Sequence, residues 1–212
     1  MVQTADLSQA TALEEIILDS GAKVGTLTLP NSPALKKIKI LGYIQNSFNV
    51  DLRQAIALEE IILGDRAKVG TLTLPDSPAL KIIGIWGTIK SADLSQATAL
   101  EAIILDRSAN VGTLTLPDSP VLKKIGIWGT VQSADLTQAT ALEVIMLGRY
   151  AKVDRLTLPN SSALKRIKIL GAVRIADLSN AKALEKITLG ADAKVDRLTL
   201  PRSKQLLGKT LG

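Results

Sequence analysis

Aliphatic residues recur at fixed short spacings along the whole chain, with polar residues between them. From Asp51 onward this pattern repeats with a period of 42 residues, and each period divides into two related halves of about 21 residues. Neighbouring aliphatic positions lie two or three residues apart instead of following the 3.6-residue period of a helix, so they predict short strands joined by turns. The first period has 45 residues because three extra residues lie between Ile44 and Asp51.

Each half-repeat contains five aliphatic positions that we expect to form the core. Alignment of successive halves pairs Leu94 with Leu116, Leu100 with Leu122, Ile103 with Ile125, Leu105 with Ile127, and Val111 with Val131. A unit of about 21 residues cannot bury its apolar side alone, so neighbouring units must stack around a shared core. The pattern therefore predicts a β-rich solenoid of roughly nine to ten coils. Because the period continues through the chain, residues 1–212 are expected to form a single repeat domain.

The composition favours a narrow aliphatic core and disfavours catalysis. The chain is 46% hydrophobic but only 2% aromatic, and it contains neither cysteine nor histidine. Disulfides, imidazole bases and nearly all zinc sites are thereby excluded. The remaining reactive groups are spread evenly over the repeats, whereas an active site needs one asymmetric constellation. We therefore expect no enzyme activity, no catalytic or metal-binding residues and no cofactor.

The sequence carries no signal for membrane insertion or secretion. No run approaches the roughly 18 apolar residues that a transmembrane helix needs. The first residues, MVQTADLSQ, have neither the charged start nor the apolar stretch of a signal peptide. We expect no transmembrane segment, and the compartment stays open.

The core segments resemble a known repeat family. Units such as ALEEIIL and ALKKIKI, the LTLP segments and the unit length of about 21 residues are similar to leucine-rich repeats. The similarity is greatest to the bacterial surface-protein types, the BspA-like and Bacteroides-type repeats, and it covers nearly the whole chain. It implies a right-handed stack of coils with short strands and little helix. It also implies adhesion or host-protein contact, and a cell-surface or secreted location if the chain is part of a larger bacterial protein.

One face of the expected sheet carries the candidate binding residues. Strand alternation places Ile103 and Leu105 inward and their neighbours outward. The candidates on the outward face are Ile82, Trp86, Ile104, Trp128, Met146, Arg166 and Lys168. A contiguous exposed apolar patch rimmed by charge is typical of a protein or ligand contact. Gly84 and Gly126 precede the two Trp by two residues and leave space for an indole to lie across the strand.

The apolar face also has an explanation that involves no binding partner in its function. A chain terminus, a neighbouring molecule or the indole rings themselves could cover it. The two Trp should lie roughly 10 Å apart, because they are two coils apart and adjacent strands are spaced by about 4.8 Å. The sequence does not decide between a functional patch and structural cover.

The charge of the chain is concentrated in its second half. Residues 1–106 contain 9 Lys and Arg against 12 Asp and Glu, a net charge of −3, whereas residues 107–212 contain 17 against 8, a net charge of +9. This imbalance indicates an anionic partner for the C-terminal half, such as an acidic protein, a sulfated or phosphorylated polymer, or a membrane surface. Much of the positive excess lies from Arg149 onward, and nucleic acid is disfavoured because Tyr150 is the only aromatic residue among the basic residues there. A solvated surface that keeps the protein soluble is the alternative.

Two further columns of side chains are periodic. The position after the first core Leu alternates between Glu and Lys, as in Glu101 and Lys123, and predicts ion pairs between coils. Another column alternates Asp and Thr, as in Asp93 and Thr115. Ice binding is a possible use of regular Thr residues, but the intervening Asp disfavours it. We expect hydrogen bonds between Thr and Asp within the sheet instead.

These observations leave two functions open. The first is a non-catalytic scaffold that presents its sheet face for protein or ligand recognition, as in a bacterial surface adhesin. The second is a structural or engineered repeat array with no natural ligand. The chain begins inside the repeat pattern, so end-to-end self-association is a further expectation.

Overall fold

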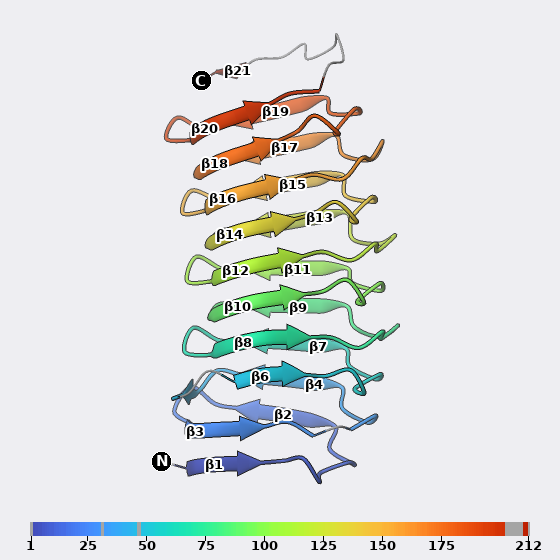
Figure 1. Ribbon diagram of the computed structural model, residues 1–212, viewed down its shortest axis with the longest axis vertical. Coiled ribbons are helices and arrows are strands. Elements are labelled where there is room, and N and C mark those ends of the chain that lie inside the picture. Colours follow the sequence, from blue (N-terminus) through green and yellow to red (C-terminus); the bar gives the residue numbers. More distant parts are fainter. Residues whose placement is uncertain (1, 31, 46–47, 202–209, 212) are drawn as a thin grey trace.

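The computed structural model describes residues 2–30, 32–45, 48–201 and 210–211, and it shows a parallel β-solenoid (Figure 1). Successive coils stack along one axis, and each coil contributes strands to two opposite faces. All strand pairs are parallel, because each strand pairs with the equivalent strand of the next coil. The prediction of a β-rich solenoid with short strands is confirmed. Nowhere in the described part of the chain is there a helix able to span a membrane.

One face is a ten-stranded parallel sheet, which we call the long sheet. It is built from the L-x-x-I-x-L segments, one strand in each coil. Its strands are β2 (Glu15–Leu18), β4 (Lys37–Ile40), β7 (Glu60–Leu63), β9 (Ile82–Ile85), β11 (Ala102–Leu105), β13 (Lys124–Ile127), β15 (Val144–Leu147), β17 (Arg166–Ile169), β19 (Lys186–Leu189) and β21 (Thr210–Leu211).

The opposite face, which we call the split face, consists of two sheets. The three-stranded sheet contains β1 (Val2–Asp6), β3 (Lys23–Thr28) and β5 (Tyr43–Ile44). The eight-stranded sheet contains β6 (Phe48–Asp51), β8 (Lys68–Thr73), β10 (Thr88–Asp93), β12 (Asn110–Thr115), β14 (Thr130–Asp135), β16 (Lys152–Thr157), β18 (Ala172–Asp177) and β20 (Lys194–Thr199).

The division of the split face coincides with the three extra residues of the first period. In that coil the strand is interrupted: Tyr43 and Ile44 pair with β3 on one side, whereas Val50 and Asp51 pair with β8 on the other. The long sheet is continuous at the same level, since β4 pairs with both β2 and β7. The insertion therefore breaks one face of the solenoid and leaves the other intact.

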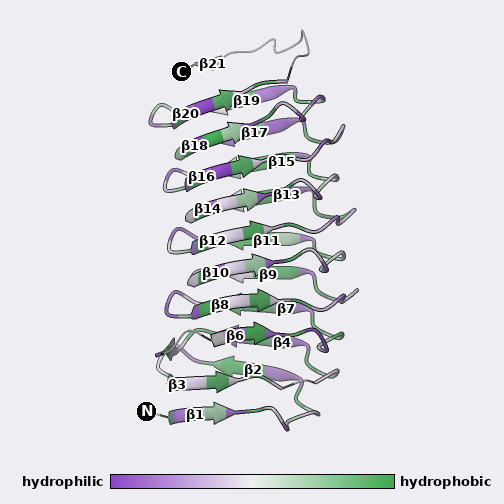
Figure 2. Ribbon diagram, viewed as in Figure 1, coloured by the Kyte–Doolittle hydropathy of each residue, from purple (hydrophilic) through white to green (hydrophobic). Residues whose placement is uncertain are grey.

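The core consists of aliphatic ladders in the predicted register. Ile103 lies opposite Ile125 and Leu105 opposite Ile127 in the long sheet, and Val111 lies opposite Val131 on the split face. Each of the ten residues in the five predicted pairs is at most 3% exposed. Figure 2 shows the apolar strands β9 and β11 in the middle of the stack and more hydrophilic strands toward the C-terminal end. The predicted core is confirmed.

Buried serines hold the corners where consecutive coils meet. The Ser77 hydroxyl lies 2.8 Å from the carbonyl oxygen of Ile56 and 3.0 Å from that of Leu58, both in the preceding coil. Ser119 makes the equivalent contact with Leu100 at 2.8 Å. Ser77 and Ser119 are fully buried. The hydroxyl thus supplies a donor for the buried carbonyl groups of Leu58 and Leu100, which satisfies their need for a hydrogen-bond partner.

The Asp column has a different role from the one predicted. Asp93 accepts a hydrogen bond from the backbone N–H of Ser95 at 3.0 Å, and Asp135 accepts one from the backbone N–H of Thr137 at 3.0 Å. Among the described residues of this column, no Thr hydroxyl is hydrogen-bonded to an Asp carboxylate in the next coil. The predicted bonds within the sheet are wrong, because each Asp instead closes a local turn of the type that Asp favours.

The Glu–Lys column forms ion pairs between coils at two described steps. Lys36 lies 2.9 Å from Glu14, and Lys81 lies 3.3 Å from Glu101. About half of each side chain is exposed, so each pair contributes little, of order 0.2 to 1 kcal/mol. The register between these coils is therefore held mainly by the aliphatic core and the backbone ladder.

Candidate binding face

The connections at one edge of the long sheet alternate in length. Four residues join β7 to β8, β11 to β12 and β15 to β16, whereas two residues join β9 to β10 and β13 to β14. Figure 1 shows the longer connections as loops that project from alternate coils. Between them the backbone turns are shorter, and we call each short turn together with the loops beside it a notch. The residues that begin the two-residue turns of the notches are Leu41, Trp86, Trp128 and Leu170.

Close packing requires glycine as the second residue of each short turn. A Cβ atom at Gly87 would overlap the carbonyl oxygens of Gly64 and Ala67 in the preceding coil. A Cβ atom at Gly129 would overlap the carbonyl oxygens of Asp106 and Ala109 in the same way. The short turns thus pack closely against the longer loops of the preceding coils. Because this packing leaves no space for a side chain, the notches have a fixed backbone geometry.

Each Trp side chain folds back across its own strand. A Cβ atom at Gly84 would overlap Cζ3 and Cη2 of Trp86, and one at Gly126 would overlap the same atoms of Trp128. The predicted space for the indoles is confirmed. The four short-turn coils read, in chain order, IKIL, IGIW, IGIW and IKIL. Glycine therefore occurs where Trp needs the space, and lysine occurs where the turn begins with Leu.

The indoles and the exposed aliphatic residues form one apolar strip. Ile104 lies opposite Gly84 on one side and Gly126 on the other, so it lies between the two rings. Ile104 and Ile82 are each 40% exposed, whereas both Trp are half-buried and lie outside the aliphatic core. We define the apolar strip by the residues Ile62, Ile82, Trp86, Ile104, Trp128 and Met146. The rings cover the glycine backbone, but the strip still presents apolar surface.

The N-terminal end of the long sheet carries charges that neutralise one another. Lys37 lies 3.5 Å from Glu60 and 3.9 Å from Glu15, and Lys39 lies 3.6 Å from Glu60. All four side chains project from strands β2, β4 and β7. This end of the face therefore has little net charge to attract a partner.

The C-terminal end of the long sheet carries cations without such neutralisation. Val144 lies opposite Arg166, and Met146 lies opposite Lys168, so the predicted basic residues directly follow the apolar strip. Together with Lys124 they border a shallow groove of about 490 Å³ over Met146. In the part of the chain that the structure describes, Lys124, Arg166 and Lys168 form no ion pair. The structure thus brings all seven predicted site residues onto one face.

The notch at Trp86 contains polar residues that the sequence pattern did not indicate. It forms a cleft of about 520 Å³ whose apolar lining includes Leu41, Ile62 and Trp86. Asp65, Asp106 and Arg107 from the two flanking loops also line it. Asp106 Oδ1 accepts hydrogen bonds from the neighbouring Ser108 through its backbone N–H at 3.2 Å and its hydroxyl at 3.1 Å. The signal in the sequence that could have indicated these loop residues is the alternation between four-residue and two-residue connections.

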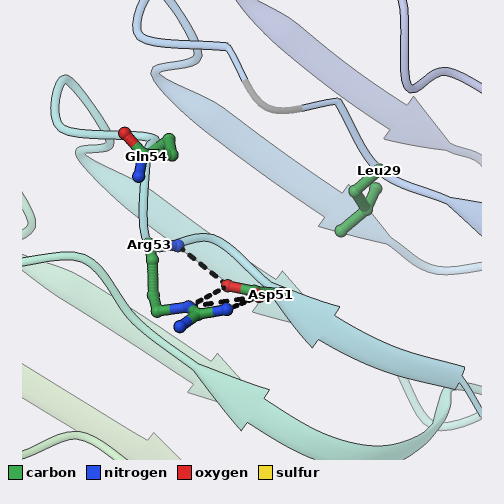
Figure 3. Close-up of a pocket in the computed structure, with 4 residues that line it drawn as sticks. All are labelled: Leu29, Asp51, Arg53 and Gln54. Carbon is green, nitrogen blue, oxygen red and sulfur yellow. Dashed lines mark hydrogen bonds and ion pairs between the residues drawn. The ribbon is translucent and has the colours of Figure 1, made fainter.

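A second cleft lies at the break in the split face. It has a volume of about 410 Å³ and is lined by Leu29, Asp51, Arg53 and Gln54 (Figure 3). Arg53 Nε lies 3.0 Å from Asp51 Oδ1, and Arg53 Nη2 lies 2.6 Å from Asp51 Oδ2. These hydrogen bonds from Arg53 lower the pKa of the Asp51 carboxyl. Both groups are therefore engaged with each other, and the cleft offers no poised base.

The carboxylates of the described surface are dispersed, and some of them are paired with arginine. Among the described residues, no three Asp or Glu side chains gather in a cluster that could hold a metal ion. Asp154 on the split face is paired with Arg174, whose hydrogen bond lowers the pKa of that carboxyl. The features that converge on one face are an apolar strip, two fixed indoles and a group of cations.

Comparison of the chain with protein-family models, with curated protein sequences and with solved structures finds no match. The similarity to leucine-rich repeats therefore rests on the sequence motifs alone, and it stays a prediction.

Proposed function

We propose that this protein is a non-catalytic binding scaffold that holds a protein partner on the long sheet. The observation that carries the proposal is that the apolar strip lies directly beside the exposed cations Arg166 and Lys168 on one face. Trp86 and Trp128 serve as anchors, because large rigid side chains contribute much contact area at low entropic cost. Ile104 and Met146 add adaptable apolar contact around them.

The charge pattern supports an acidic partner. Arg166 and Lys168 attract carboxylates and accelerate association, and this effect weakens as salt rises. The neutral N-terminal end cannot do the same, because Lys37 and Lys39 already face Glu60. Nucleic acid is the weaker alternative. Tyr150, although 64% exposed, is a single ring and makes no stacking platform.

The resemblance of the sequence motifs to bacterial leucine-rich repeats supports a role in attachment. In our proposal the chain is a segment of a bacterial surface adhesin, and the long sheet is the face that contacts the host protein. The competing function is a structural or engineered array with no natural ligand. It is favoured by the regular register of the core ladders, which needs no partner to explain it.

Replacement of both indoles tests the scaffold directly. The double variant Trp86→Ser/Trp128→Ser should remain folded, because neither ring belongs to the aliphatic core, and should lose partner affinity by several kcal/mol. The matched control is the double variant Ile17→Ser/Val121→Ser, which removes two exposed apolar residues outside the strip. Circular dichroism and thermal melting establish folding, and quantitative pull-down establishes binding.

The outcomes separate the two functions. A partner that is lost from the Trp variant and kept by the control supports the scaffold. A partner kept by both variants shows that the strip is not the binding face. If the wild-type chain binds no protein specifically, the repeat array is the better description.

A further inference from the structure

The groove over Met146 on the long sheet is charged in one sign only, and we call it the cationic groove. It has a volume of about 490 Å³, and Val144 and Met146 of β15 contribute apolar side chains to it. None of the described residues that line it is acidic. Its charged lining residues are Lys124, Arg166, Lys168 and Lys186.

Two other clefts of the described surface contain both signs of charge. The cleft at the break in the split face holds the ion pair of Asp51 and Arg53. The cleft at Trp86 contains two aspartates beside an arginine. Neither cleft selects for one sign of charge, whereas the cationic groove selects for anions.

The register of the long sheet places two of the groove cations directly opposite each other. Arg166 on β17 pairs with Lys186 on β19, and both side chains are exposed. Like charges in such a cross-strand position destabilise a sheet. At the other end of the same column the sign alternates, because Lys37 lies opposite Glu15 on one side and Glu60 on the other. The balance of charge that the repeat achieves there is missing at the cationic groove.

The nearest glutamates along the chain do not compensate this charge. Glu143 directly precedes Val144, and Glu185 directly precedes Lys186. In the described part of the chain, neither carboxylate lines the groove or forms an ion pair with one of its cations. An anion that enters the groove from solution would therefore meet positive charge that no carboxylate neutralises. It would also relieve the repulsion between Arg166 and Lys186.

The floor of the cationic groove adds an apolar requirement. Val144 is half-buried, and Met146 is 36% exposed. Met146 lies opposite Gly126, whose backbone is covered by the Trp128 ring. The groove is thus continuous with the apolar strip. A ligand that carries only charge, such as inorganic phosphate, would leave this apolar floor in contact with water.

An aromatic ring that carries a tetrahedral anion satisfies both requirements. A flat ring covers the apolar floor, and the Met146 sulfur makes favourable contacts with such rings. A phosphate ester has three strong acceptor oxygens and a charge of about −1.5 to −2, more than the carboxylate of an acidic side chain. Arg166 can bind two of these oxygens at once through its planar guanidinium, and the lysines contribute further donors.

We propose that the cationic groove receives a tyrosine side chain of the partner protein that carries a phosphate or sulfate ester. This inference rests on the proposed function and names the residue of the partner that the cations recognise. In the complex the ring lies on Val144 and Met146. Arg166 and Lys186 bind the oxygens of the ester, and Lys168 closes the groove beside Met146.

Matched peptides test the proposal on the intact chain. The probes are a short peptide with phosphotyrosine at its centre and the same peptide with sulfotyrosine. The comparison peptides carry unmodified tyrosine, phosphoserine or glutamate at that position, so they separate the contribution of the ring from that of the anion. Isothermal titration measures each affinity. Anionic phospholipid vesicles and a mononucleotide are titrated in parallel, because both also present phosphate.

We expect one or both tyrosine esters to bind about tenfold more tightly than every comparison peptide. The double variant Arg166→Gln/Lys186→Gln should weaken this binding about tenfold without lowering the melting temperature, because it also removes two opposed like charges. The matched control Lys152→Gln/Arg155→Gln removes the same two residue types from β16 on the split face and should bind normally. Met146→Ser should weaken binding of the tyrosine ester and leave that of the phosphoserine peptide unchanged.

Several results would overturn the inference. They are equal binding of the ester and unmodified tyrosine peptides, equal binding of the phosphoserine peptide, no binding of either ester, and tighter binding of the vesicles or the nucleotide. These failures differ from failure of the proposed function. A partner that is lost from Trp86→Ser/Trp128→Ser but kept by Arg166→Gln/Lys186→Gln leaves the binding face in place and removes the ester site. If the ester peptides bind as expected and the partner does not depend on either Trp, the groove stands and the apolar strip fails as the anchor.

Discussion

The pyrrole edge of Trp128 lies against Gly148 of the next coil, where a Cβ atom would overlap Cδ1 of the ring. The six-membered ring of the same indole lies over Gly126 of its own strand. One side chain is thus held by two glycines in adjacent coils. Trp86 has Asp106 instead of glycine at the position after it in the stack, and Asp106 lines the cleft beside this indole.

Gly126→Ala should displace the Trp128 ring into solvent. The added Cβ occupies the space of the ring, and overpacking of this kind costs about 1 to 3 kcal/mol. In a Trp86→Phe background, the emission of Trp128 should shift to longer wavelength. Gly21→Ala is the matched control, because no atom lies within 4 Å of the added Cβ. Unchanged emission of the Gly126→Ala variant would contradict the observed packing.

Ile125→Ala should destabilise the protein strongly. Ile125 is 2% exposed, and truncation of such a side chain costs about 2 to 5 kcal/mol. Val121→Ala, in the same half-repeat, removes an exposed side chain and should change the free energy of unfolding by less than about 0.5 kcal/mol. Chemical denaturation measures both. Equal denaturation midpoints for the two variants would contradict the assignment of Ile125 to the core ladder.

Ser77→Ala should cost about 1 to 3 kcal/mol, because the buried carbonyl group of Leu58 and the partly buried one of Ile56 lose their shared donor. Ser91→Ala changes a half-buried serine on the split face and should have little effect. Denaturation midpoints of the two variants provide the test. A neutral Ser77→Ala variant would show that the corner does not depend on this hydroxyl.

Acid should destabilise the fold partly through Asp177. The hydrogen bonds from Ser179 hold the pKa of the Asp177 carboxyl below its ordinary value of 3.8. A carboxyl with a lowered pKa stabilises the folded state above the unfolded-state pKa, and this contribution is lost as the pH falls through the folded-state pKa. The loss therefore lies below about pH 4. Asp177→Asn does not titrate, so its stability should fall less steeply in this range, and parallel profiles would contradict the assignment.

Copies of the 212-residue chain should associate through the first coil. Val2 is 54% exposed, whereas Val24, its partner in register in the next coil, is 4% exposed. A second copy stacked on β1 would bury this apolar surface. Sedimentation over a wide concentration range should show association, and Val2→Lys should reduce it. A strict monomer at high concentration would exclude this contact.

Much of the long sheet was predictable from the sequence. The aliphatic spacing predicted the coil, the register of Ile103 with Ile125 and the outward direction of Ile104 and Met146. The Gly-x-Trp spacing predicted the folded-back indoles. These features follow from local alternation and exact repetition, so each coil places equivalent residues at the same level of the stack.

Sequence alone determined the period, the core ladder and the face on which the candidate residues lie. The tertiary structure decided the remaining features, because these features depend on distances between coils. Asp93 bonds within its own turn instead of across the sheet, since the nearest donor is the backbone N–H of Ser95. The three-residue insertion divides only the split face, because the aliphatic ladder keeps β4 paired on both sides. The notches exist because short turns press against longer loops in the neighbouring coils, a contact between residues about 20 positions apart.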